Sequence, residues 1–137
     1  MPYILGIDYG IKRIGTAVAS TETGIATPLT VVAGRNDVTR DARNVADLGE
    51  KEAVASFVVG LPLNMDGTES EQTALTRKFA AELERLSKRP VHLQDERLTS
   101  FAAEEVLDTA GIASRRRRGL IDPIAAQKIL QAYLDPP

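Results

Sequence analysis

The stretch at residues 4–15 (ILGIDYGIKRIG) constrains the fold most, because it joins a short apolar run to a single acid. Apolar residues lead to Asp8, glycine follows at Gly10, and apolar residues resume at Ile14. The pattern predicts a buried strand, a tight turn at Gly10 and a second strand running back beside the first. An unpartnered buried polar group costs about 2–7 kcal/mol. Asp8 is therefore a turn former, a cap or a ligand for a cation.

The whole chain, with this stretch included, reads as three strands followed by alternating helices and strands. Hairpin-linked strands followed by αβ units indicate an α/β protein with a five-stranded mixed β-sheet flanked by helices on both faces. The expected strands are residues 3–8, 14–20, 26–33, 53–59 and 91–96. Four helices are expected. The first spans residues 38–48, and the second starts with a capping box at Thr68 and Glu71 and ends before Arg89-Pro90. The third runs from Thr99 to Gly111, and the last starts at Asp122.

Composition excludes several kinds of site. The 137 residues suit one domain, residues 1–137, and contain no cysteine, so neither disulfides nor thiolate metal sites are expected. The single histidine, His92, excludes a multi-histidine metal site. We expect neither a signal peptide nor a membrane span. With a net charge of -2, contacts to nucleic acid must come from local basic clusters.

Three acids are candidates for one site. Asp8 ends the first strand, Glu96 ends the last strand, and Asp122 starts the last helix. The carboxyl ends of parallel strands share an edge where ligands bind, and a helix crossing that edge could deliver Asp122. Clustered carboxylates repel one another, and a divalent cation relieves the repulsion. Ligation by oxygen alone suits Mg²⁺ or Mn²⁺.

Each acid also has an ordinary structural explanation. Asp8 fits a turn, and Glu96 fits a surface ion pair with Arg97. Asp122 followed by Pro123 is a favoured helix start, worth about 1 kcal/mol. Strand alternation lets only one of the neighbours Asp95 and Glu96 face the site, and does not decide which. The residues alone therefore leave the metal site as one alternative among several.

Basic residues lie near two of these acids. Lys12 and Arg13 follow the turn after Asp8, and a run of four arginines precedes Asp122. Such a run is usually a solvated loop, but beside an acidic site it can hold backbone phosphates. The predicted nucleic-acid contacts are Lys12, Arg13, Arg97, Arg115, Arg116, Arg117 and Arg118.

Four segments together resemble a bacterial family, the pre-16S ribosomal RNA nucleases, also described as Holliday-junction-resolvase-like proteins. They are GIDYGIKRIG (6–15), VVGLPLNMDGTES (58–70), QDERLTS (94–100) and IDPIAAQKILQAYL (121–134). The resemblance runs nearly end to end. It implies a ribonuclease-H-like fold, a catalytic metal site at Asp8, Glu96 and Asp122, and Glu96 rather than Asp95 as the ligand.

The function implied by the resemblance is metal-dependent hydrolysis of phosphodiester bonds in maturing the 5′ end of pre-16S ribosomal RNA in the cytoplasm. In this hypothesis Asp8 bridges two Mg²⁺ or Mn²⁺ ions, and Glu96 and Asp122 complete the ligand sets. If another strand lies between the strand of Asp8 and the strand of Glu96, the two strands are roughly twice 4.8 Å apart. Glu96 then needs its longer side chain to reach the same site as Asp8.

Three alternatives stay open. The same chemistry could act on a Holliday junction or other branched DNA. The acids could be vestigial in an RNA-binding ribosome assembly factor. An ATP-dependent phosphotransferase of the actin or sugar-kinase type shares the strand and Asp-Gly opening, but needs two such domains. Either a monomer or a homodimer is compatible with the sequence.

Overall fold

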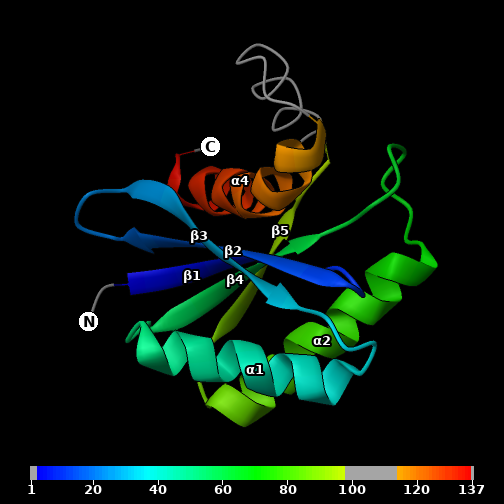
Figure 1. Ribbon diagram of the computed structural model, residues 1–137, viewed down its shortest axis with the longest axis horizontal. Coiled ribbons are helices and arrows are strands. Elements are labelled where there is room, and N and C mark those ends of the chain that lie inside the picture. The colour runs from blue at the N-terminus through cyan, green and yellow to red at the C-terminus, as the bar shows by residue number, and fades with distance from the viewer. Residues whose placement is uncertain (1–2, 98–113, 137) are drawn as a thin grey trace.

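The computed structural model describes residues 3–97 and 114–136, and these form a five-stranded sheet with helices on both faces (Figure 1). The strand order is β3-β2-β1-β4-β5. Strand β1 is antiparallel to β2 and parallel to β4, so the sheet is mixed, as the sequence predicted. The strands are β1 (Tyr3–Asp8), β2 (Arg13–Ser20), β3 (Ile25–Ala33), β4 (Ser56–Leu61) and β5 (Val91–Asp95).

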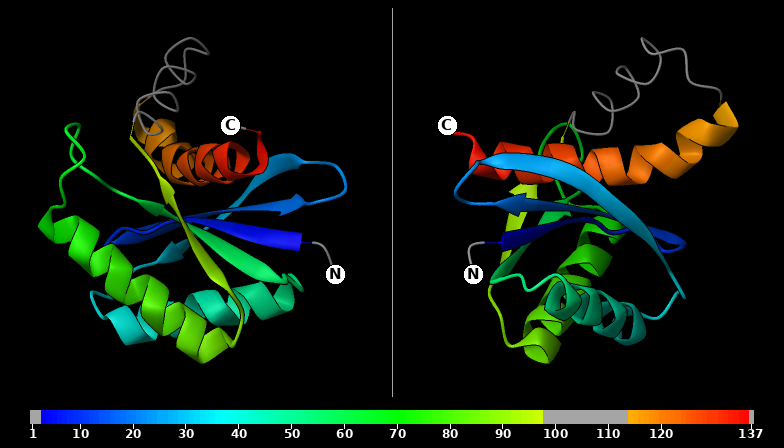
Figure 2. Two further views of the ribbon diagram at one scale, coloured as in Figure 1. Left: turned by 180° about the vertical axis from the view of Figure 1, so that it is seen from behind. Right: turned by 60° about the vertical axis from the view of Figure 1, so that its left-hand side comes forward.

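Three described helices cover the sheet: α1 (Val38–Lys51), α2 (Glu71–Ser87) and α4 (Ser114–Leu134). Helices α1 and α2 lie on one face, and α4 runs along the other (Figure 2). No helix in the described ranges is long and apolar enough to span a membrane.

Strand β1 divides its side chains between these two layers. Leu5 and Ile7 are fully buried in the core with α1 and α2, whereas Ile4 is buried in the core with α4. Successive side chains of a strand point to opposite faces. Asp8 therefore shares the α4 face with Ile4, and the acid at the end of β1 lies beneath the C-terminal helix.

Helix α4 comes close to the sheet because many of the strand residues below it are small. Ala17 and Ala19 of β2 and Ala126 of α4 are buried in this interface. A Cβ atom at Gly15 would collide with the backbone of Asp122. The missing side chain of Gly15 therefore sets how near Asp122 comes to the end of β1, where Gly15 pairs with Asp8.

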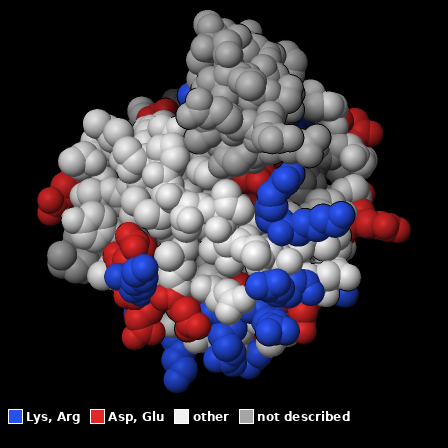
Figure 3. Space-filling view, viewed as in Figure 1, with Lys and Arg blue, Asp and Glu red and all other residues white. Residues whose placement is uncertain are grey.

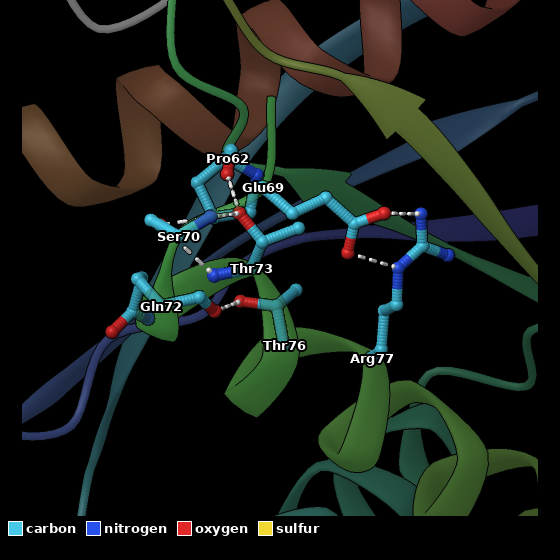
Figure 4. A network of polar contacts seen from close by, with 7 residues as sticks. All are labelled: Pro62, Glu69, Ser70, Gln72, Thr73, Thr76 and Arg77. Carbon is cyan, nitrogen blue, oxygen red and sulfur yellow. Dashed lines mark hydrogen bonds and ion pairs between the residues drawn. The ribbon is translucent and has the colours of Figure 1, made fainter. Parts of the chain in front are cut away.

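Two predicted boundaries are wrong because local capping differs from the prediction. Helix α2 starts after Ser70, whose side chain and that of Thr73 bond each other's backbone N–H groups (Figure 4). The predicted cap residue, Thr68, instead hydrogen-bonds with Asp66 in the preceding loop. Strand β4 runs from Ser56 to Leu61 rather than over residues 53–59, because α1 extends to Lys51 and the chain then turns.

The last helix also differs from its prediction. Helix α4 begins at Ser114, and Pro123 lies inside it, so Asp122 is not an N-cap. The arginine run (residues 115–118) therefore lies on a helix rather than in a loop. A proline inside a helix removes one backbone hydrogen bond, and α4 continues through it to Leu134. The helix predicted for residues 99–111 lies outside the described residues.

We expect Gly15→Ala to lower the free energy of unfolding by about 1–3 kcal/mol, because the added methyl group must push α4 away from the sheet. The measurement is a urea denaturation curve of each variant. Gly24→Ala is the control, since a Cβ there meets no atom within 4 Å and only the positive φ of 68° opposes it. A smaller loss at Gly15 than at Gly24 would contradict the close packing.

Candidate functional site

Asp8 and Glu96 meet above the sheet although their strands are not neighbours. Strand β4 lies between β1 and β5, and Glu96 directly follows β5, where its N–H donates to Leu61 O at 3.2 Å. The two acid side chains are hydrogen-bonded. A Cβ at Gly60 of β4 would collide with Glu96 Oε2. Glu96 therefore crosses the intervening strand through the space that the missing side chain of Gly60 leaves.

Asp122 is the third acid, and α4 brings it to the same end of the sheet. Its backbone rests on Gly15, the cross-strand partner of Asp8. Arg13 Nε lies 3.0 Å from Asp122 Oδ2, although the N–H is not aligned for a hydrogen bond. Asp122 is thus close enough to Asp8 for their charges to interact, and it already has a cation beside it.

The electrostatics of the site favour protonated acids. Burial, and then the charge of Asp8, raises the pKa of Glu96 from 4.5 to about 8. Burial and the charge of Asp122 raise the pKa of Asp8 from 3.8 to about 6, while its hydrogen bond with Glu96 lowers it. Burial also raises the pKa of Asp122, against the opposing effect of Arg13. At neutral pH the Asp8–Glu96 pair therefore shares one proton, held mainly by Glu96.

The donor set is suited to a hard cation. Glu96 Oε2 and Asp122 Oδ2 are buried and accept no aligned hydrogen bond from the residues described. Buried oxygens of this kind are the ligands that Mg²⁺ and Mn²⁺ prefer. Within residues 3–97 and 114–136, no three Asp, Glu, His or Cys side chains are already arranged around a metal position. The acids thus form a close pair and a neighbour, and not a closed cage.

Asp95 and Arg97 lie outside this arrangement. The Asp95 carboxylate accepts from Arg97 Nε at 2.8 Å and from the Arg97 backbone N–H at 3.0 Å. Arg97 Nη1 also donates to Met65 O at 3.4 Å, which ties the 62–69 loop to the end of β5. Of the two neighbouring acids, Glu96 joins Asp8, and Asp95 binds Arg97. The alternative explanation of Glu96, a surface ion pair with Arg97, does not hold, because Arg97 pairs with Asp95.

The predicted basic contacts differ in how far the structure describes them. Lys12 and Arg13 are exposed at the turn after β1, and a Cβ at Gly10 would meet Arg13 O at 2.5 Å, so Gly10 keeps that turn tight. Residues 115–118 lie in the first turns of α4. On the face shown in Figure 3, Lys and Arg form separate groups with acids beside them, in agreement with the net charge of -2.

Two residues that shape the site do not emerge from the sequence pattern alone. The pattern places Gly60 at the end of a strand and assigns no role to Gly15. Glycine inside a strand marks a bulge or a close approach of other groups, and both residues interrupt apolar strand patterns. That signal could have located them, but only the tertiary structure shows that Glu96 and α4 fill the spaces.

The sheet, the acid at the end of β1 and the acid on the C-terminal helix define a protein of the ribonuclease-H-like fold. A solved structure of T. thermophilus RuvC in complex with Holliday junction substrate has this fold, with a TM-score of 0.58 and 18% identity over 98% of this chain and 94% of that chain. The chain belongs to the RuvX family, described as Holliday junction resolvase, whose family model matches residues 2–136. The resemblance inferred from the four sequence segments is therefore confirmed.

Curated relatives match over almost the whole chain. A protein of Anaeromyxobacter sp. (strain K) is 45% identical over 131 residues, which covers 96% of this chain and 95% of the relative. One from Paracoccus denitrificans (strain Pd 1222) is 42% identical over 132 residues, which covers 96% and 83%. Both carry the name "Putative pre-16S rRNA nuclease".

The raised pKa values predict that the metal-free protein loses stability as pH rises. Glu96 titrates near 4.5 when unfolded and at about 8 when folded, so its contribution is complete below pH 4.5 and is lost as pH approaches 8. Asp8 adds to the loss between its ordinary pKa of 3.8 and about 6. We expect a total loss on the order of 2–4 kcal/mol, measured by thermal melts in chelator from pH 4.5 to 8.

Glu96→Gln tests the origin of this slope. The amide cannot ionise, so the variant should be more stable than the wild type at pH 8 and much less sensitive to pH. Asp95→Asn removes the adjacent exposed carboxylate and should keep most of the slope. Equal slopes in the wild type and in Glu96→Gln would contradict the assignment to Glu96.

Proposed function

We propose that this chain is a divalent-metal-dependent nuclease that hydrolyses phosphodiester bonds of pre-16S ribosomal RNA in 5′-end processing during ribosome biogenesis. The proposal treats residues 1–137 as one nuclease domain that works in the cytoplasm. The observation that carries it is the buried Asp8–Glu96 pair beside Asp122, in which Glu96 Oε2 and Asp122 Oδ2 accept no aligned hydrogen bond from the described residues. Unpaired buried oxygens destabilise a fold, and a cation bound between these acids would supply the missing partner.

Asp8, Glu96 and Asp122 would hold Mg²⁺ or Mn²⁺. The bound ion would supply an activated water and neutralise charge on the leaving oxygen. Glu96 must release the proton that it shares with Asp8 before both carboxylates act as ligands. Gly60 keeps Glu96 within reach of Asp8, and the close packing of α4 on Gly15 keeps Asp122 beside them.

The substrate part of the proposal rests on basic groups and on the relatives. Lys12, Arg13 and the arginine run (residues 115–118) would contact backbone phosphates on either side of the acids. Arg97 is held by Asp95, so its exposed edge adds a weaker phosphate contact. The relatives' shared name supports a ribosomal RNA precursor as the substrate.

Branched DNA is the second candidate substrate, favoured by the description of the RuvX family as Holliday junction resolvase. The chemistry at the acids would be the same, and only the polymer would differ. A third alternative is an RNA-binding assembly factor whose acidic site has no catalytic activity.

The sequence is compatible with a monomer or a homodimer. Sedimentation of the protein with and without RNA separates the two.

Asp8→Asn and Glu96→Gln should each lower cleavage of a pre-16S RNA fragment by more than about 100-fold. Changing even groups that only orient metal ligands costs about 10–100-fold, so loss of a ligand costs more. The measurement is gel-resolved cleavage with Mn²⁺ or Mg²⁺, beside a four-way DNA junction of matched length. Asp47→Asn, an exposed acid on α1, is the control and should cleave as the wild type does.

The outcomes of this assay separate the alternatives. Cleavage of the junction but not of RNA would transfer the proposal to branched DNA. If the wild-type protein binds RNA but cleaves neither polymer, the assembly-factor role would be favoured. Equal activity in the wild type and in Asp8→Asn would reject the acidic site itself.

Replacing Arg115, Arg116, Arg117 and Arg118 with alanine should weaken RNA binding and flatten its salt dependence. Each phosphate of single-stranded RNA that no longer has a cation beside it lowers the slope of log K against log salt by about 0.7, so the slope should fall by roughly 1–3. Fluorescence anisotropy at several salt concentrations measures it. Replacing Arg40, Arg43 and Lys51 of α1, on the other face of the sheet, is the control. An unchanged slope would exclude the arginine run from the interface.

A further inference from the structure

A cavity of about 410 Å³ opens beside Asp122. Its walls are the turn after β1 and the side chains at the start of α2 and within α4. The lining residues are Gly10, Ile11, Lys12, Arg13, Gln72 and Asp122. Gln72 lies in the first turn of α2, and its side chain points away from the Glu69–Arg77 ion pair (Figure 4), with Nε2 donating to Tyr9 O at 3.3 Å. Two cations and one carboxylate thus border a space that can admit a phosphodiester group.

Arg13 and Asp122 form an ion pair at the edge of this cavity. Arg13 begins β2, two residues before Gly15, so it shares the strand face on which the Asp122 backbone rests. The Arg13 side chain is 55% exposed and that of Asp122 only 17%. A guanidinium carries five N–H donors, more than one carboxylate oxygen can accept. Arg13 can therefore turn towards a second anion with little rearrangement.

The pair joins one group suited to a cation and one suited to a phosphate. A metal ion bound to Asp122 separates it from Arg13, which then lacks an anionic partner. A phosphate bound to Arg13 separates the same pair, and Asp122 then lacks a cationic partner. When both ligands are present, each charge has an opposite charge beside it. Each ligand therefore removes part of the electrostatic cost of binding the other, and this coupling is reciprocal.

We propose that this cavity is a subsite for an RNA backbone phosphate, and that Arg13 is shared between Asp122 and that phosphate so that metal and RNA strengthen each other's binding. The inference rests on the proposed function, because it takes Asp122 as a metal ligand. It adds a place for the phosphate and a role for Arg13 in the metal-free protein, that of a replaceable counter-cation.

The size of the effect follows from the exposure of the pair. Ion pairs that water reaches are worth about 0.2–1 kcal/mol, so separating this one changes a binding constant by about 1.5–5-fold. In Arg13→Gln, Mn²⁺ should bind about 2–5-fold more tightly without RNA, because Asp122 no longer has a competing cation. RNA should bind more weakly, and the factor by which it tightens Mn²⁺ binding should shrink by about 2–5-fold.

The test is calorimetric titration of Mn²⁺ into the wild type, Arg13→Gln, Arg13→Lys and Lys12→Gln. Each is titrated without RNA and with a saturating RNA oligonucleotide, and a gel run after each titration verifies that the RNA is intact. Lys12→Gln is the matched control: it removes one positive charge from the same cavity, but Lys12 is not in the ion pair with Asp122. Arg13→Lys keeps the charge and should retain part of the coupling.

The inference is supported if Arg13→Gln tightens Mn²⁺ binding more than Lys12→Gln does and reduces the coupling with RNA. It is overturned if the two variants change Mn²⁺ binding equally, because the effect is then one of net charge. Failure of the proposed function gives a different result: the wild type and Asp8→Asn would then take up Mn²⁺ alike. Circular dichroism of each variant verifies its fold.

Discussion

The structure of the site depends on the close approach of α4 to one face of the sheet. Small residues on β1, β2 and β4 make that approach possible, and at Gly15 the backbone of Asp122 occupies the space of a side chain. Because helix and sheet are in such close contact, an acid on the C-terminal helix lies beside an acid at the end of the first strand. The other face, where larger side chains such as Phe57 of β4 and Phe79 of α2 pack between the sheet and the helices, supplies much of the core. The two faces thus have different tasks: one stabilises the fold, and the other positions the carboxylates.

Close packing also explains why the acids lower the stability of the metal-free protein. Asp8 and Glu96 lose water on burial and face each other's charge, so a proton remains between them at neutral pH. Arg13 offsets part of the same cost at Asp122. A fold that keeps such groups together without full pairing stores electrostatic free energy, which a divalent cation can release on binding. In the proposed function, the affinity for a divalent cation would therefore have the same origin as this loss of stability.

Local patterns predicted the features that depend on neighbouring residues. The apolar run, Asp8 and Gly10 indicated the hairpin, and the order of elements indicated the mixed sheet. Long-range packing decided what the sequence could not. Asp122 before Pro123 has the signature of a helix start, yet α4 begins at Ser114 and passes through both. Alternation left Asp95 and Glu96 equivalent until the partner of each was known. The metal-ligand and phosphate-binding roles remain predictions, because they concern groups that the protein chain alone does not contain.

Glu96 reaches Asp8 across β4, and not from an adjacent strand. The separation of their backbones is therefore fixed by the spacing of the sheet, roughly twice 4.8 Å, and the side chains must make up the difference. An aspartate at position 96 would carry the same charge and end one carbon short. A longer residue at position 60 would block the passage even with both acids intact. Contact between the two acids thus requires both the length of the Glu96 side chain and the absence of a side chain at Gly60. A negative charge at position 96 is not sufficient.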